Sequence, residues 1–118
     1  MTEEHRAEIA VRLLKKALEL LASDAEAQTR YVHHLRIDPD EMALEFDDAF
    51  RRVVGLSDMG LLPDSVLTTV LPIDEHLQRM TGSRPEVWTV AGLQNSPDWQ
   101  ELRSLAKEAM EDISAMEV

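Results

Sequence analysis

Apolar residues recur at every third or fourth position along most of the chain, which is the spacing of amphipathic α-helices. In the first segment the repeat consists of Ala7, Ala10, Leu14, Ala17 and Leu21. Three further apolar residues widen this sector, namely Ile9, Leu13 and Leu20. A helix that is apolar over most of its circumference usually lies at the centre of a bundle or contributes to a contact between subunits. We expect one of these two roles for the first helix.

Polar residues and prolines indicate where the next two helices begin. Residues 23–26 read Ser-Asp-Ala-Glu, a capping-box pattern, and predict a second helix over roughly 24–36. Residues 38–41 read Asp-Pro-Asp-Glu, which places an acid at the N-cap and proline at the first helical position of a third helix. The inner face of that helix is predicted to consist of Met42, Phe46, Ala49, Phe50 and Val53. Gly55 is a residue at which it can end.

A fourth helix is predicted from Pro63-Asp64 to about Gly82, with Pro72 in its interior. An internal proline removes one backbone hydrogen bond and crowds the preceding turn. The apolar residues nevertheless keep a regular spacing across the proline, at Val66, Val70, Ile73, Leu77 and Met80. We therefore expect one helix that is kinked at Pro72 rather than two separate helices.

The last helix is predicted to begin at Ser96-Pro97, with an inner face of Trp99, Leu102, Ala106, Ala109, Ile113 and Met116. Residues 55–62 are expected to be a connector, and residues 82–96 to be irregular with a helical turn near 89–93. Trp88 and Trp99 are interpreted as packing residues. No strand pattern occurs, so the sequence predicts a single all-α domain over residues 1–118, a compact bundle of four or five helices.

The chain is strongly acidic, because 23 Asp and Glu against 12 Lys and Arg give a formal net charge of −11. The excess lies entirely in residues 38–118, since residues 1–37 carry six acidic and six basic side chains. Such a charge disfavours binding to nucleic acid or to an anionic membrane, and it would steer a protein partner with a basic surface. The alternative is that the charge serves only solubility.

The composition also bears on the compartment. There are no cysteines, which excludes disulfides and thiolate metal sites. The chain does not open with a cationic segment followed by an apolar one, and no apolar run approaches the ~18 residues of a membrane span. A cytoplasmic protein without membrane association is therefore expected.

No catalytic or cofactor motif can be recognised. The sequence contains no G-x-S-x-G turn that would present a nucleophilic serine. The four glycines are isolated, so there is no phosphate-binding loop. His33 and His34 are neighbours, about 100° apart on a helix, and do not suit a single ion. His76 lies on the presumed polar side of the fourth helix. We expect no metal and no cofactor, and we favour a non-enzymatic role.

The most informative feature is a run of six acidic residues at the start of the third helix. Its members are Asp38, Asp40, Glu41, Glu45, Asp47 and Asp48. The helix dipole favours anions in the first turn, which accounts for the first three members but not for the last three. Arg51 and Arg52 can each pair with an acid four residues earlier and so offset part of the charge.

Leu44 lies inside this run, about 160–180° from the centre of the predicted inner face. Its helical neighbours are Asp40, Glu41, Asp47 and Asp48. An apolar side chain ringed by carboxylates resembles a binding hot spot with a charged rim. The candidate partner-binding residues are therefore Leu44, Asp40, Glu41, Glu45, Asp47 and Asp48. Two structural alternatives remain: residues 55–62 fold over Leu44, or a single surface leucine has no role.

Two stretches carry a loose resemblance to known proteins. Residues 40–48 read Asp-Glu-Met-Ala-Leu-Glu-Phe-Asp-Asp, and residues 99–106 read Trp-Gln-Glu-Leu-Arg-Ser-Leu-Ala. Both look similar to short helical proteins of actinobacteria, for which we know no assigned activity. The resemblance implies a helical fold and a bacterial origin, and it adds nothing on mechanism.

Three functional hypotheses follow from the sequence. The leading one is a small acidic protein-binding module, in concrete form an inhibitor or immunity-type protein that covers a basic surface on a toxin or nuclease. The second is a helical enzyme or ligand-binding domain with a pocket between helices. The third is a homodimer formed through the first helix, which would bury Ile9, Leu13 and Leu20.

Overall fold

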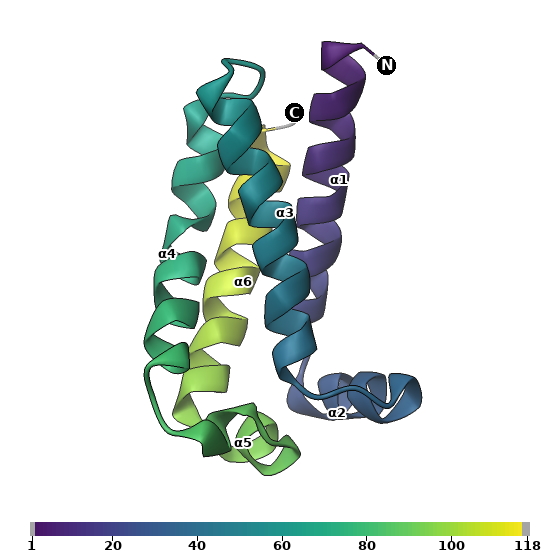
Figure 1. Ribbon diagram of the computed structural model, residues 1–118, viewed down its shortest axis with the longest axis vertical. Coiled ribbons are helices and arrows are strands. Elements are labelled where there is room, and N and C mark those ends of the chain that lie inside the picture. The colour runs from purple at the N-terminus through teal and green to yellow at the C-terminus, as the bar shows by residue number, and fades with distance from the viewer. Residues whose placement is uncertain (1, 117–118) are drawn as a thin grey trace.

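The computed structural model describes residues 2–116, which form six α-helices and one short 3₁₀ helix without any strand (Figure 1). The elements are α1 (Glu3–Ala22), α2 (Ala25–Leu35), α3 (Asp40–Asp58), α4 (Asp64–Thr81), η1 (Pro85–Trp88), α5 (Val90–Asn95) and α6 (Pro97–Met116). The all-α class expected from the sequence is confirmed. The expected count of four or five helices is too low, because α5 is a helix in addition to the five that the sequence predicted, α2 among them. Within the described residues, no helix is long and apolar enough to cross a membrane.

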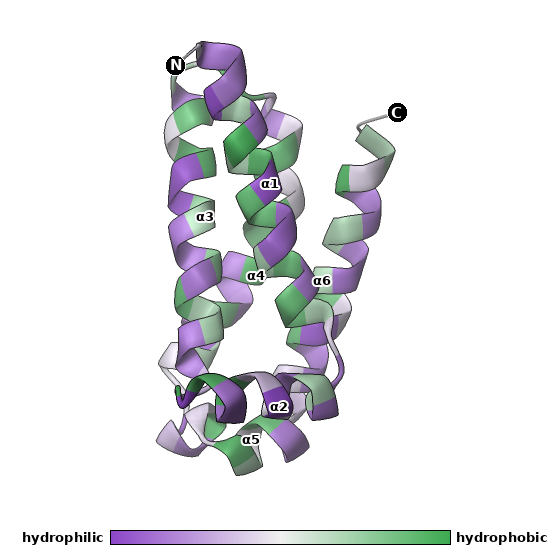
Figure 2. Ribbon diagram, turned by 90° about the vertical axis from the view of Figure 1, so that its right-hand side faces the viewer, coloured by the Kyte–Doolittle hydropathy of each residue, from purple (hydrophilic) through white to green (hydrophobic). Residues whose placement is uncertain are grey.

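The four long helices run side by side along the 42 Å axis of the molecule. Around the bundle the packed neighbours are α1 with α3, α3 with α4, α4 with α6, and α6 with α1. Each helix runs antiparallel to both of its neighbours. The short helices α2 and α5 pack on each other and lie across one end of the bundle (Figures 1 and 2). Because α2 connects α1 to α3, it also closes the lower end of the seam between them.

The core lies between the four long helices and contains the apolar faces expected from the sequence. On α3 the side chains of Met42, Phe46, Ala49 and Val53 are buried. Full burial of a large apolar side chain contributes about 1.5–3 kcal/mol, so these faces hold the bundle together. Two members of the expected faces are less buried than predicted: Phe50 is half-buried, and Met116, in the last turn of α6, is exposed.

Both tryptophans are packing residues, as the sequence indicated. The Trp99 ring is fully buried, and its indole N–H donates a hydrogen bond of 2.7 Å to the carbonyl of Val87. Trp88 packs edge-on against it, with 5.9 Å between ring centroids. The segment before α6 is more regular than expected, because η1 and α5 occupy most of residues 85–95. Gly92 permits their close approach, since a Cβ at that position would clash with the carbonyl of Glu86.

Helix starts lie close to their predicted positions, but two capping details differ. The N-cap of α2 is Asp24, whose carboxylate accepts a hydrogen bond of 2.8 Å from the amide of Ala27. Ser23 instead ends α1, with its hydroxyl donating to the carbonyl of Glu19. At the start of α3 no side chain caps the helix, and the backbone carbonyl of Asp38 accepts the amide of Glu41. The helices therefore begin near the expected residues, but different chemical groups cap them.

Helix α3 does not end at Gly55, as the sequence suggested, but continues to Asp58. The helix terminates through Gly60, which has a φ of 73°. The amide of Gly60 donates to the carbonyl of Ser57, and the amide of Leu61 donates to that of Leu56. This is a Schellman motif, which requires a left-handed residue that glycine adopts without steric cost. Gly55 therefore lies inside the helix.

Helix α4 continues through Pro72 as one element from Asp64 to Thr81, as the apolar spacing predicted. The Pro72 ring is exposed on the outer side of the bundle, while Val70 and Ile73 beside it are fully buried. The bend of the axis at Pro72 stays a prediction.

Candidate functional site

The six candidate partner-binding residues all lie on the solvent side of α3, but they divide between two surfaces. Leu44 is 50% exposed, so residues 55–62 do not cover it. Asp47 forms an ion pair of 2.9 Å with Arg51. Four of the candidates form a surface that we call the outer face, namely Asp40, Glu41, Leu44 and Asp47. The other two, Glu45 and Asp48, line a groove between α3 and α1.

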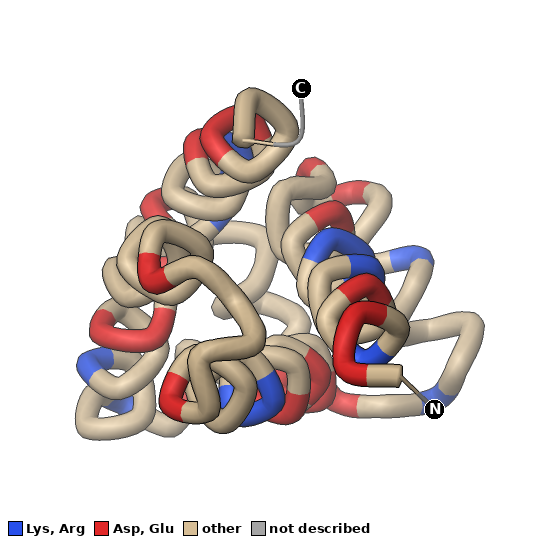
Figure 3. The backbone as a smooth tube through the Cα atoms, turned by 90° about the horizontal axis from the view of Figure 1, so that it is seen from above, with Lys and Arg blue, Asp and Glu red and all other residues tan. Residues whose placement is uncertain are grey.

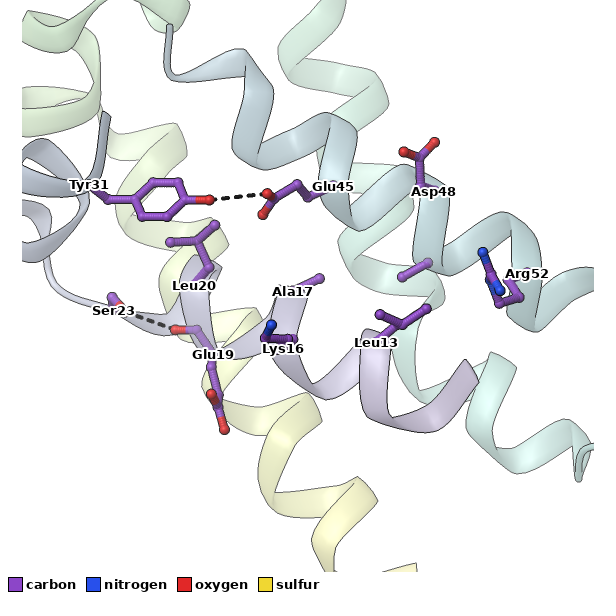
Figure 4. Close-up of a pocket in the computed structure, with 11 residues that line it drawn as sticks. Leu13, Lys16, Ala17, Glu19, Leu20, Ser23, Tyr31, Glu45, Asp48 and Arg52 are labelled. Carbon is purple, nitrogen blue, oxygen red and sulfur yellow. Dashed lines mark hydrogen bonds between the residues drawn. The ribbon is translucent and has the colours of Figure 1, made fainter. Parts of the chain in front are cut away.

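The groove follows the seam between the antiparallel helices α1 and α3, and α2 closes it at one end (Figure 4). Its lower part has a volume of about 590 Å³. The apolar lining consists of Leu13, Ala17, Leu20 and Ala49. The charged lining consists of Lys16, Glu19, Glu45, Asp48 and Arg52. The residues at the closed end are Ser23 and Tyr31.

A second hollow of about 310 Å³ continues the groove towards the N-terminus of α1. Its lining comprises Arg6, Ile9, Arg52, Gly55, Leu56 and Met59. Arg52 lines both hollows, so they are two parts of one surface feature, which we call the α1/α3 groove. Apolar side chains on both helices are accessible in it: Leu13 is 37% exposed and Met59 57% exposed.

Small residues at the seam explain why a groove exists there. Ala17 of α1 and Ala49 of α3 are both buried where the two helices meet in the lower part. In the upper part Gly55 has no side chain, and a Cβ at this position would meet no atom of residues 2–116 within 4 Å. Longer side chains at these positions would fill the seam. Neither the pairing of α1 with α3 nor the small residues that face each other could be inferred from one helix alone.

Tyr31 and Glu45 close the lower end of the groove by linking α2 to α3 (Figure 4). The Tyr31 hydroxyl donates a hydrogen bond of 3.1 Å to a carboxylate oxygen of Glu45. Burial, this hydrogen bond and the negative charge of Glu45 together raise the pKa of Tyr31 above its ordinary value of 10.0. All three effects disfavour the phenolate. Glu45 thus has a structural partner that the sequence did not reveal.

A buried polar network at the same end of the bundle was not predicted from the sequence. Gln28 is fully buried, and its amide nitrogen donates to the carbonyls of Leu20 and Leu21 at the end of α1. Its side-chain oxygen accepts a bond of 2.8 Å from the Nε of Arg103, which also donates to the carbonyl of Leu93. Burial lowers the pKa of Arg103, and the charge of Asp24 partly opposes this. The network joins α1, α2, α5 and α6, and neither Gln28 nor Arg103 lines the groove.

His76 was expected on the polar side of the fourth helix, and this expectation was wrong. The side chain is buried, with Nε2 at 2.8 Å from the carbonyl oxygen of Asp98 and Nδ1 at 3.3 Å from a guanidinium nitrogen of Arg79. The short contact with a carbonyl places the proton on Nε2, and Nδ1 then accepts from Arg79. His76 thereby ties α4 to the first turn of α6. The pair His33 and His34 is exposed on the surface of α2.

Within residues 2–116, no group of three or more His, Asp or Glu side chains is arranged to hold a metal ion. Every buried side-chain nitrogen or oxygen in this part of the chain has a hydrogen-bond partner. Charged positions occur on all four bundle helices when the molecule is seen end-on (Figure 3).

No protein-family model, curated protein or solved structure matches the chain. The outer face and the α1/α3 groove are the two candidate functional surfaces.

Proposed function

We propose that the protein is a small acidic, non-enzymatic, cytoplasmic protein-binding module whose outer face covers a basic surface on another protein. In its concrete form it is an inhibitor or immunity-type protein that acts on a toxin or nuclease. The partner would be recognised through Leu44 and the carboxylates around it, with further acidic contacts at the groove.

The observation that carries this proposal is the exposure of Leu44 among carboxylates. The core of α3 is already filled by Met42, Phe46 and Val53, so packing within this chain does not require an apolar residue at position 44. An apolar anchor inside a charged rim is the arrangement of many binding hot spots. The rim charge would accelerate association with a basic partner and favour it over acidic competitors.

The shape of the groove favours a protein partner over a small ligand. Ligand sites usually enclose most of the ligand surface. The α1/α3 groove is instead an open channel between two helices, closed only at the α2 end (Figure 4). Its lining combines apolar and charged side chains from both helices. Such a surface suits a contact with another folded chain.

The test compares two variants that change the net charge equally. The first combines Leu44→Ala with Asp40→Asn and Asp47→Asn, and it leaves the groove untouched. The control combines Leu71→Ala with Glu108→Gln and Asp112→Asn, all exposed positions on α4 and α6. Both variants should retain an unfolding free energy within about 1 kcal/mol of the wild type, the usual range for surface substitutions.

A tagged wild-type chain is used to capture partners from the native cell at low salt, and a captured basic protein is then purified. Calorimetric titration should show that the first variant binds this protein at least tenfold more weakly, a difference of about 1.4 kcal/mol. The control should bind like the wild type, and wild-type binding should weaken steeply with salt. Equal binding by both variants, or capture of no basic protein, would contradict the proposal.

A further inference from the structure

Helix α1 carries a second stripe beside the one that faces the core. It lines the α1/α3 groove and consists of Arg6, Ile9, Leu13, Lys16, Leu20 and Ser23. The spacing is three, four, three, four and three residues, which is the period of a helix surface that packs against another helix. Ile9 and Leu20 are half-buried, and Leu13 is more exposed than either. Packing within the chain thus leaves this stripe incompletely covered.

Helix α3 contributes a matching stripe from the other side of the groove. It consists of Glu45, Asp48, Arg52, Gly55 and Met59, again at alternating intervals of three and four. The stripe is polarised along its length, because the two carboxylates lie towards the α2 end and the arginine lies beyond them. On α1, Arg6 lies at one end and Glu19 near the other, with Lys16 as the one basic residue among the carboxylates of the α2 half. The carboxylates outnumber Lys16 there, so the groove has a net negative charge towards its α2 end and a net positive charge at the opposite end.

Gly55 provides a second observation at the centre of the upper groove. A glycine inside a helix is less favourable than alanine by about 1 kcal/mol. Among residues 2–116, no atom lies within 4 Å of where a Cβ at Gly55 would be, and the residue has an ordinary helical backbone. Neither packing nor conformation within these residues accounts for the glycine. Glycine at an exposed helical position allows the backbone of another helix to approach closely.

We propose that the α1/α3 groove docks onto the same groove of a second copy, related by a two-fold axis perpendicular to the four helices. This rotation exchanges the two ends of the groove, so the acidic end of one copy faces the basic end of the other. Asp48 then lies opposite the second copy's Arg52. Because the interface is isologous, Arg52 also lies opposite the second copy's Asp48. The apolar lining residues of the two copies meet beside these charge pairs.

The polarity of the groove is what identifies the occupant as a second copy. A uniformly basic helix would meet Arg52 and Arg6 in the upper groove, and a uniformly acidic one would meet Glu45 and Asp48 in the lower. The groove extends along about 17 residues of α1, a length of about 26 Å, and the two helices that form it are about two helix diameters wide. These dimensions give a contact area of roughly 500 Å² per copy. The total is close to the ~1,000 Å² minimum of specific interfaces, so a weak, concentration-dependent dimer is expected.

Sedimentation velocity of the purified chain over a wide concentration range tests the proposal. The wild type should change from monomer to dimer as its concentration rises. Arg52→Glu and Asp48→Arg should each remain monomeric, because each places like charges opposite each other twice. An equimolar mixture of these two variants should form a heterodimer, since both contacts then join opposite charges. Lys107→Glu on α6 is the control and should dimerise like the wild type.

Circular dichroism and thermal melts accompany each variant, and the exposed positions of Asp48 and Arg52 predict folded proteins. Gly55→Gln adds a test without a change of charge, because it should fill the upper groove and abolish the dimer. A wild type that stays monomeric throughout, or a mixture that fails to associate although each variant is folded, would overturn the proposal. The outcome is independent of the outer face, because no basic partner is present in the experiment.

Discussion

The Nε atom of Arg103 lies 2.8 Å from the side-chain oxygen of Gln28, although 75 positions separate the two residues in the chain. This bond connects the last bundle helix to the short helix α2. The amide nitrogen of Gln28 in turn donates to two carbonyls at the C-terminal end of α1. A polar residue is tolerated at a fully buried position because each of its polar atoms has a partner.

Arg103→Met is expected to lower the free energy of unfolding by about 2–3 kcal/mol, because it leaves Gln28 and the carbonyl of Leu93 without a donor. Urea denaturation measures this difference. Arg30→Met removes an exposed ion pair with Glu26 and should change stability by less than about 0.5 kcal/mol. If the two substitutions had equal effects, the network would not stabilise the fold.

The titration of Tyr31 should depend on Glu45. Tyr31 is the only tyrosine in the chain, so the ultraviolet absorbance of tyrosinate reports on it alone. Its raised pKa means that the folded state favours the neutral phenol, and this contribution is complete below pH 10.0. It is lost as the pH rises through the folded-state pKa. Glu45→Gln removes the charge, so tyrosinate should form at lower pH than in the wild type.

Glu41→Gln is the matched control for this titration, since it lies on the same helix and makes no hydrogen bond with Tyr31. It should leave the titration close to that of the wild type. A Glu45→Gln curve that coincides with the wild-type curve would show that the hydrogen bond between Tyr31 and Glu45 does not form in solution.

Arg36→Gly is expected to stabilise the protein. Arg36 has a φ of 56° and follows α2 in the left-handed region. That conformation is unfavourable for a residue with a Cβ by about 1–2 kcal/mol. This gain is partly offset by the larger entropy of glycine in the unfolded chain. The expected net stabilisation is about 0.5–1 kcal/mol. Gly60→Ala, at a position with a φ of 73°, should instead destabilise the protein in the same thermal melts.

Pro72→Ala should leave the fold intact and raise the free energy of unfolding slightly. Because α4 is continuous across the proline, the new amide can donate to the carbonyl of Thr68 four residues earlier. One such bond contributes about 0.5–1.5 kcal/mol. Thermal melts and amide exchange over residues 70–76 measure the effect. A destabilisation of several kcal/mol would mean that Pro72 is needed to begin a separate helix.

The helices themselves could be predicted from the sequence because their signals are local. The apolar spacing around Met42 and Phe46 identifies the buried face of α3, and Ser96-Pro97 marks the start of α6. Leu44 could be placed on the outside by the same helical geometry. Each of these inferences needs only residues within one or two helical turns.

Signals at the ends of helices were less decisive, because several residues can perform the same local function. Gly55 and Gly60 both suit a helix terminus, and the backbone conformation at Gly60 determines which of them ends α3. Ser23 and Asp24 both suit an N-cap, and only Asp24 reaches the amide of Ala27. The identity of the side chain does not settle such a choice.

The buried polar residues and the groove depend on contacts between residues far apart in the chain. The burial of Gln28 and His76 depends on Arg103 and on the carbonyl of Asp98, which lie far away in the chain and become neighbours only in the bundle. The α1/α3 groove exists because Ala17 and Ala49 meet between helices whose adjacency no local pattern specifies. The sequence alone therefore determined which faces are apolar and which are charged. The tertiary structure decided which of those faces meet, because packing depends on pairs of helices rather than on single ones.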